Sequence, residues 1–192
     1  MSYFLQAAQL ILEFVFGAVA TLFLLRMIAE AARVQFHNPI SQFVYRSTNP
    51  VLAPLRRVLR NWRNINLAAI AVAWLAELVK LGLEFLLAGG LPNPAGWLLL
   101  GFGQLLDLFL LVYIVLIFVW SLGSLLGGDP GHPLLRFVAQ LVEPPMRPLR
   151  RRMPTLGGLD FSPAVAILVL MLLRILVAGP LIGYASSLIV GA

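Results

Sequence analysis

The chain has 192 residues, of which 60% are hydrophobic and 11% charged, against about 45–50% and about 25% in soluble proteins. A chain this short has too much surface for its volume to bury so many apolar side chains, which excludes a soluble globular enzyme and requires a lipid bilayer to cover part of them. The net charge is +6 and there is no cysteine, so disulfides, thiolate nucleophiles and cysteine-based metal sites are excluded.

Four stretches are long and apolar enough to cross a hydrocarbon core of about 30 Å, which needs about 20 residues per helix. They cover approximately residues 3–25, 65–87, 97–126 and 161–182. The first should be retained, because it lacks the basic leader and small-residue cleavage site of a signal peptide. Gly179-Pro180 predicts a kink or an end in the fourth. The sequence therefore predicts an all-α membrane protein with four transmembrane helices.

Basic residues are concentrated in two of the connecting segments. Of the 14 Lys and Arg residues, seven lie between residues 26 and 64 and five between residues 127 and 159. Because cytoplasmic loops carry the excess of Lys and Arg, both segments are predicted in the cytoplasm and both termini outside.

A shift of 94 residues aligns the two basic segments without a gap. Pro39 falls on Pro133, and the Pro-Leu-Arg-Arg sequence of residues 54–57 falls on that of residues 148–151. We interpret this as two repeats, residues 1–96 and 97–192, each a helix, a basic loop and a second helix. Because each unit crosses twice, the two repeats are parallel.

Each basic segment is predicted to contain an amphipathic helix that lies in the cytoplasmic interface, near residues 50–62 and 134–152. Asn49 and Pro50 would serve as the N-cap and the first residue of the first of these helices. Asn66 and Asp160 precede the second and fourth spans and are predicted to cap them.

The two segments together carry a recognisable pattern. The first copy has His37-Asn38-Pro39, Asn49-Pro50 and the Pro-Leu-Arg-Arg sequence; the second has Glu143-Pro144, Pro-Leu-Arg-Arg and Gly-Gly-Leu-Asp-Phe-Ser-Pro over residues 157–163. This pattern resembles the YggT family of bacterial membrane proteins, related to the YlmG proteins of Gram-positive bacteria, cyanobacteria and plastids, over nearly the whole chain.

The first copy departs from the pattern, with Asn-Trp-Arg-Asn at residues 61–64 in place of Thr-Leu-Gly-Gly. Asn66 also replaces the aspartate, so any role of that aspartate is assigned to Asp160. The resemblance implies links to osmotic-stress tolerance and ion uptake. For the YlmG branch, it implies roles in cell division, nucleoid organisation or cytochrome assembly.

The repeated arginines are the first candidate site. Arg56, Arg57, Arg150 and Arg151 could bind anionic lipid headgroups or a protein partner, or could act only as topology signals. Nucleic-acid binding is not expected, because no recognition motif accompanies the arginines.

Ionisable residues inside the spans are the second candidate site, because a charge in hydrocarbon is costly. Glu77, Lys80 and Glu84 share a helix face, and three further residues could join them across the bundle: Glu13, Asp107 and Arg174. The group is interpreted as an ion or proton path. The alternatives are a structural polar seam, or positions near the outer interface from which long side chains reach the headgroups.

Nothing in the sequence indicates an enzyme or a cofactor. His37 and His132 stand alone and do not define a metal site, and no catalytic triad or P-loop is present. The leading hypothesis is a non-enzymatic adaptor or assembly factor in envelope homeostasis, including osmotic stress. The rival is a subunit of an ion-permeation system, which with only four spans would need a homo-oligomer.

Overall fold

The computed structural model describes residues 3–35, 37–59, 61–127, 129, 131–152 and 160–190. Its helices are α1 (Tyr3–Ala31), α2 (Pro39–Leu55), α3 (Leu67–Leu87), α4 (Pro94–Leu125), α5 (Pro133–Arg152), α6 (Ser162–Leu173), the π-helix η1 (Arg174–Ala178) and α7 (Gly179–Val190). Within these residues the only β pairing is an isolated bridge between Trp62 and Ile65. The all-helical prediction is confirmed for this part of the chain.

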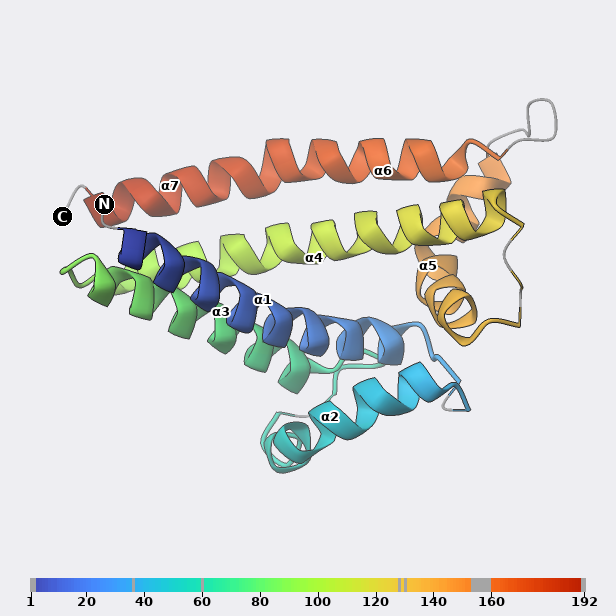
Figure 1. Cartoon of the computed structure of the whole chain (residues 1–192), viewed down its shortest axis with the longest axis horizontal. Helices are drawn as coiled ribbons and strands as arrows, with labels where there is room; N and C mark the ends of the chain where they lie inside the picture. Colours follow the sequence, from blue (N-terminus) through green and yellow to red (C-terminus); the bar gives the residue numbers. More distant parts are fainter. Residues whose placement is uncertain are drawn as a thin grey trace.

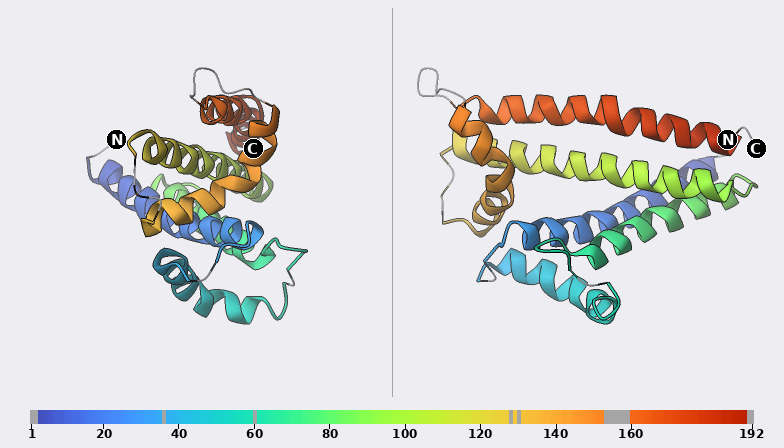
Figure 2. Two further views of the ribbon diagram at one scale, coloured as in Figure 1. Left: turned by 90° about the vertical axis from the view of Figure 1, so that its right-hand side faces the viewer. Right: turned by 180° about the vertical axis from the view of Figure 1, so that it is seen from behind.

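Four helical rods run lengthwise beside one another: α1, α3, α4 and the continuous rod α6–η1–α7 (Figure 1). Both ends of the chain and the connection from α3 to α4 lie at one end of the bundle. The shorter helix α5 lies across the opposite end, and α2 lies beside the neighbouring ends of α1 and α3 (Figure 2). The two basic segments therefore share one end of the molecule.

Three of these rods are long and apolar enough to cross a membrane, namely α1, α4 and residues 162–189. The predicted spans are confirmed to that extent. Helix α3 has 21 residues, but Glu77, Lys80 and Glu84 lie within it. Whether α3 crosses the membrane depends on whether these three charged side chains are paired or kept away from lipid.

The fourth rod extends beyond its predicted end at residue 182, continuing to Val190. The π-helix η1 immediately precedes Gly179-Pro180, and the Gly179 N–H donates to the Arg174 carbonyl five residues back. This wide turn gives the Pro180 ring the space that a regular helix denies it, so the proline does not end the rod. The helix α1 is also longer than predicted, reaching Ala31 instead of residue 25.

The predicted start of the first amphipathic helix at Pro50 is wrong. Helix α2 begins at Pro39, where the Asn38 Oδ1 accepts a hydrogen bond from Ile40 N at 2.9 Å, and Pro50 lies inside it. Val44, Thr48 and Leu52 are buried at four-residue intervals, and the packing of this face holds the helix through its prolines, which keep a helical φ. A helix is present at the second predicted stretch, residues 134–152, as α5.

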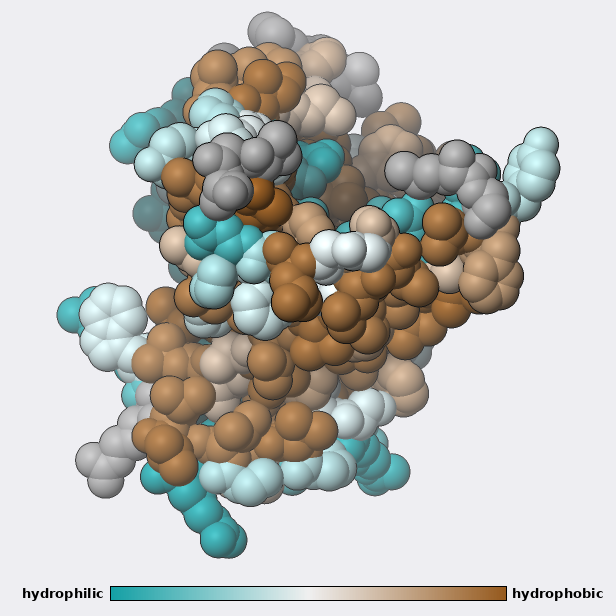
Figure 3. Space-filling model, turned by 90° about the vertical axis from the view of Figure 1, so that its left-hand side faces the viewer, coloured by the Kyte–Doolittle hydropathy of each residue, from teal (hydrophilic) through white to brown (hydrophobic). Residues whose placement is uncertain are grey.

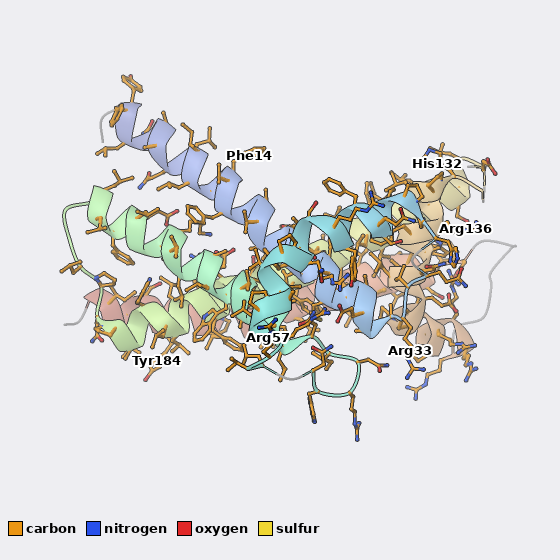
Figure 4. All side chains as sticks on the ribbon, turned by 90° about the horizontal axis from the view of Figure 1, so that it is seen from below. Phe14, Arg33, Arg57, His132, Arg136 and Tyr184 are labelled. Atoms are coloured by element: carbon orange, nitrogen blue, oxygen red, sulfur yellow. The ribbon has the colours of Figure 1, made fainter. Side chains whose placement is uncertain are left out.

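Exposed apolar side chains cover much of the rods, and the face at the end that holds the termini is largely hydrophobic (Figure 3). Phe14 on α1 is 77% exposed and Tyr184 on α7 is 61% exposed, and both lie away from the basic end of the bundle (Figure 4). Large apolar side chains with this exposure fit a surface that contacts lipid.

Close contact between α4 and α7 depends on glycine. A Cβ atom placed on Gly96 would lie 2.6 Å from Ile189 Cγ1 and 3.1 Å from the Ala185 carbonyl oxygen. On Gly103 it would lie 2.9 Å from Ile182 Cγ1. Small residues at such positions let membrane helices approach closely, which brings α7 against the side of α4 that holds the polar residues described next.

Candidate functional site

A polar cavity of about 400 Å³ lies inside the bundle, between α1, α3, α4 and α7. Six polar side chains line it, beside a glycine and aliphatic residues: Glu13, Thr21, Glu77, Lys80, Gln104 and Asp107. Four of the six ionisable residues grouped from the sequence thus line one cavity. Arg174 contacts it through Asp107, and Glu84 is not among its lining residues. Thr21 and Gln104 were missed, because uncharged polar residues do not stand out in a hydropathy profile.

Two ion pairs organise the charges around this cavity. The Arg174 Nε and Nη2 atoms each donate to an Asp107 carboxylate oxygen at 2.7 Å, a bidentate pair that joins the π-helix to α4. The Lys80 Nζ lies 2.6 Å from Glu77 Oε2, without the alignment of a hydrogen bond. Glu77 is only 2% exposed, so Lys80 is needed to compensate a buried carboxylate.

Glu13 gives the cavity one more negative charge than positive charge. It lies on the exposed side of α1 at the cavity edge and forms no ion pair among the described residues. Three carboxylates therefore line or border the cavity, against the two cations Lys80 and Arg174. This excess of negative charge can attract a cation or a proton.

The first arginine of the first Pro-Leu-Arg-Arg segment is used inside the molecule. Arg56 donates to Glu30 Oε1, and Arg26 Nη2 lies 2.5 Å from the same oxygen. Arg26 is 2% exposed and its guanidinium carbon lies 4.0 Å from the centroid of the Tyr45 ring. This cluster fastens the end of α2 to α1. The spacing of Arg26 and Glu30, four residues apart on one helix, could have indicated the pair, but not its contact with Arg56.

The corresponding arginine of the second segment is also engaged, with different partners. Arg150 Nε lies 3.2 Å from Asp160 Oδ2 and Nη1 lies 3.5 Å from Glu143 Oε2. Its guanidinium carbon lies 4.2 Å from the centroid of the Trp120 ring. Trp120 aligns with Arg26 under the shift of 94 residues. Arg56 and Arg150 therefore contact corresponding regions of α1 and α4.

The second arginine of each pair, by contrast, is exposed. Arg57 and Arg151 both lie on the surface and form no ion pair within the described part of the chain. The four arginines that the sequence grouped together therefore divide into two inward members, Arg56 and Arg150, and two outward ones.

The two predicted caps differ in detail. Asn66 is the N-cap of α3, where its Oδ1 accepts from Ala69 N at 3.0 Å. Asp160 Oδ1 accepts from Ser162 N at 2.9 Å, but the N-cap of α6 is Phe161. Hydrogen bonding from the Ser162 hydroxyl, aided by its backbone N–H and by Arg150, holds the pKa of the Asp160 carboxyl below its ordinary value, although partial burial opposes this.

The described residues contain no group of three His, Asp or Glu side chains that could hold a metal ion. His37 and His132 lie at the starts of α2 and α5, and Figure 4 shows His132 at the basic end of the molecule. The Gly157-Gly158-Leu159 part of the second motif and the side chain of Arg60 lie outside the described residues.

Comparison with known proteins gives consistent matches over most of the chain. The sequence model of the CCB3/YggT family matches twice, over residues 5–87 and 99–181. The uncharacterized protein PA0392 of Pseudomonas aeruginosa is 36% identical over 176 residues, covering 89% of this chain and 88% of its own length. The uncharacterized protein YggT of Escherichia coli K12 is 34% identical over 170 residues, covering 88% and 87%. No solved structure matches.

Proposed function

Because the chain belongs to the CCB3/YggT family, we propose that it is a four-span protein of the bacterial inner membrane, built from two parallel repeats. In this arrangement both termini are periplasmic and α2 and α5 are cytoplasmic. Support comes from the two family matches, whose starts are 94 residues apart, and from the position of both basic helices at one end of the bundle.

Helix α3 is the fourth span of this proposal. Its buried Glu77 is paired with Lys80 and faces the cavity instead of lipid, while Glu84 lies three residues from the end of the helix, within reach of the interface. Periplasm-dependent reporters fused to each terminus and cytosol-dependent reporters in each basic segment should all be active. Activity with the opposite polarity would contradict the topology.

The activity we propose is that of a non-enzymatic adaptor or assembly factor in envelope homeostasis, including osmotic-stress tolerance. The observation that carries it is the placement of Arg57, in the turn that follows α2, and of Arg151, on α5: both are exposed, and each follows an arginine, Arg56 or Arg150, that fastens its segment to the bundle. A planar guanidinium on a backbone held in place is suited to gripping carboxylates or phosphates of a partner surface.

Replacement by lysine tests this role, because lysine preserves the positive charge that sets orientation but not the bidentate grip. The variant Arg57→Lys/Arg151→Lys should insert at a normal level yet lose complementation of a null strain under osmotic challenge. The exposed Arg46 is the matched control, and Arg46→Lys should complement. Full complementation by a variant with all four arginines replaced would leave them no role beyond orienting the chain.

A second candidate function, a subunit of an ion-permeation system, is favoured by the polar cavity. Its excess negative charge lies within a region that the proposed topology buries in the bilayer, where such groups often mark ion or proton paths. A homo-oligomer would be needed to complete a continuous path. Purified protein in liposomes should then conduct potassium, sodium or protons, and Glu77→Gln should abolish the flux. The absence of any flux would remove this candidate.

A further inference from the structure

A second hollow, separate from the cavity and from the Pro-Leu-Arg-Arg arginines, lies between the end of α1 and the outer face of α5. It has a volume of about 530 Å³, and Arg136, Gln140 and Arg147 supply its basic and amide groups. Small side chains and a proline form its floor: Ala32, Ala139 and Pro144. The short floor residues create a groove, and the arginines reach into it from α5.

The positive charge of this groove is not neutralised by the protein. Arg136 and Arg147 are exposed and form no ion pair in the described ranges. The acidic residue of the groove is Glu143, and its ion pair is with Arg150, at 3.5 Å. Glu143 is thus drawn towards the end of α5, and two guanidinium groups remain for an outside anion.

The two arginines stand at different ends of the groove. They are eleven residues apart on one helix, about 16 Å at about 1.5 Å per residue. A single phosphate could not be gripped by both without bending each side chain far along the helix axis. Two phosphates joined by a short linker need less bending, because each guanidinium then has to reach only its own phosphate.

The groove is tied together by contacts between the two repeats. Asn38 Nδ2 donates to the Pro133 carbonyl oxygen at 2.6 Å, and Gln35 N donates to Gln140 Oε1 at 3.2 Å. A smaller hollow of about 100 Å³ continues from Arg136 along this seam. These contacts hold the start of α2 against α5, so the groove is preformed.

The level of the groove relative to the membrane indicates that the anion is part of a lipid headgroup. Ala32 directly follows the last residue of α1, a helix long enough to cross the membrane, so the groove lies where the chain leaves the hydrocarbon and meets the headgroups. Arg136 lies at the same end of the molecule as Arg33 (Figure 4). Basic pockets at this level of helical membrane proteins suit acidic lipid headgroups.

We propose that this groove binds a phospholipid whose headgroup carries two phosphates joined by glycerol, that is cardiolipin, with one phosphate at Arg136 and the other at Arg147. Gln140 and the backbone around the small residues face the glycerol between them. The site uses neither Arg57 nor Arg151. A negative result for cardiolipin binding would therefore leave the adaptor role proposed for Arg57 and Arg151 untouched, and the reverse also holds.

The test is titration of the purified full-length protein in mixed micelles with cardiolipin, measured by native mass spectrometry. The variant Arg136→Gln/Arg147→Gln should lose at least about tenfold in affinity, which corresponds to about 1.4 kcal/mol. The control Arg46→Gln/Arg152→Gln removes the same charge from exposed positions and should bind as the unaltered protein does. Phosphatidylglycerol, with one phosphate, should bind at least about tenfold more weakly than cardiolipin.

Three results would overturn the proposal. These are undiminished cardiolipin binding by the double variant, an equal loss in the control, and displacement of cardiolipin by inorganic phosphate at equal concentration, which would indicate a site for a free anion. If the glutamine variant fails to fold, Arg136→Lys/Arg147→Lys keeps the charge and should still lose binding, because a lysine cannot form the bidentate contact. Full binding by a folded lysine variant would also contradict the proposal.

Discussion

Replacing Glu30 by glutamine should lower the free energy of unfolding far more than replacing Arg56 or Glu143, which are more exposed partners of ion pairs. Glu30 forms an ion pair with Arg26 and accepts a hydrogen bond from Arg56, and Arg26 is 2% exposed. Without the carboxylate, Arg26 is a buried cation whose remaining contacts are with Tyr45. Breaking a buried pair in this way costs about 3–5 kcal/mol, and the cation–π contact, worth about 1–2 kcal/mol, is already present and offsets none of that loss.

The matched variants should fall in a fixed order. Arg56→Gln leaves Glu30 its pair with Arg26, and the Arg56 side chain is 28% exposed, so about 1 kcal/mol is expected. Glu143→Gln removes a partner that is 53% exposed and 3.5 Å away, for about 0.5 kcal/mol or less. Adding Arg26→Met to Glu30→Gln should restore most of the stability, because no buried charge is then left.

The free energy of unfolding can be measured by titrating the protein from a mild detergent into sodium dodecyl sulfate while following the fluorescence of its four tryptophans. The reasoning is refuted if Glu30→Gln costs no more than Glu143→Gln. It is refuted equally if the added Arg26→Met substitution fails to recover stability, since the cost would then not arise from an unpaired guanidinium.

Two further predictions concern Asp160 and the contact between α4 and α7. The lowered pKa of Asp160 means that its charged form stabilises the fold above the carboxyl's unfolded pKa of about 3.9; this contribution should be lost as pH falls through the still lower folded pKa, and Asp160→Asn should remove that part of the pH dependence of thermal unfolding. Gly96→Ala should cost about 1–3 kcal/mol, because its Cβ would meet the backbone of α7 at Ala185, which cannot rotate away. Gly183→Ala, whose Cβ meets nothing within 4 Å, is the control.

The sequence predicted the features that follow from the composition of a continuous stretch, such as the long apolar helices. It missed the features that depend on contacts between distant parts of the chain. The three helices that are long and apolar enough to span a membrane follow from hydropathy, which any bilayer imposes on a helix. The start of α2 was misplaced because Pro50 is favourable in a first turn, while the burial of Val44 and Leu52 that carries a helix through Pro50 is a tertiary effect.

The candidate sites divide in the same way. The cost of charge in hydrocarbon was enough to group Glu13, Glu77 and Asp107 as related residues, and the fold places all three around one cavity. No local pattern relates Glu30 to Arg56, which are 26 residues apart. The groove at Arg136 and Arg147 also required the fold, because its floor comes partly from the end of another helix.

The different partners of Arg56 and Arg150 limit how far the two halves of this protein could be interchanged. Arg56 requires the carboxylate of Glu30, but the aligned position on α4 is Ser124; Arg150 requires Asp160, where the first half has Asn66. A chimaera that carried α4 in place of α1 would put Ser124 where Arg56 has Glu30, and would leave Arg56 without that acid. Each half is thus fitted to its own internal partners, so exchanging a single helix between the halves should give a protein that assembles poorly.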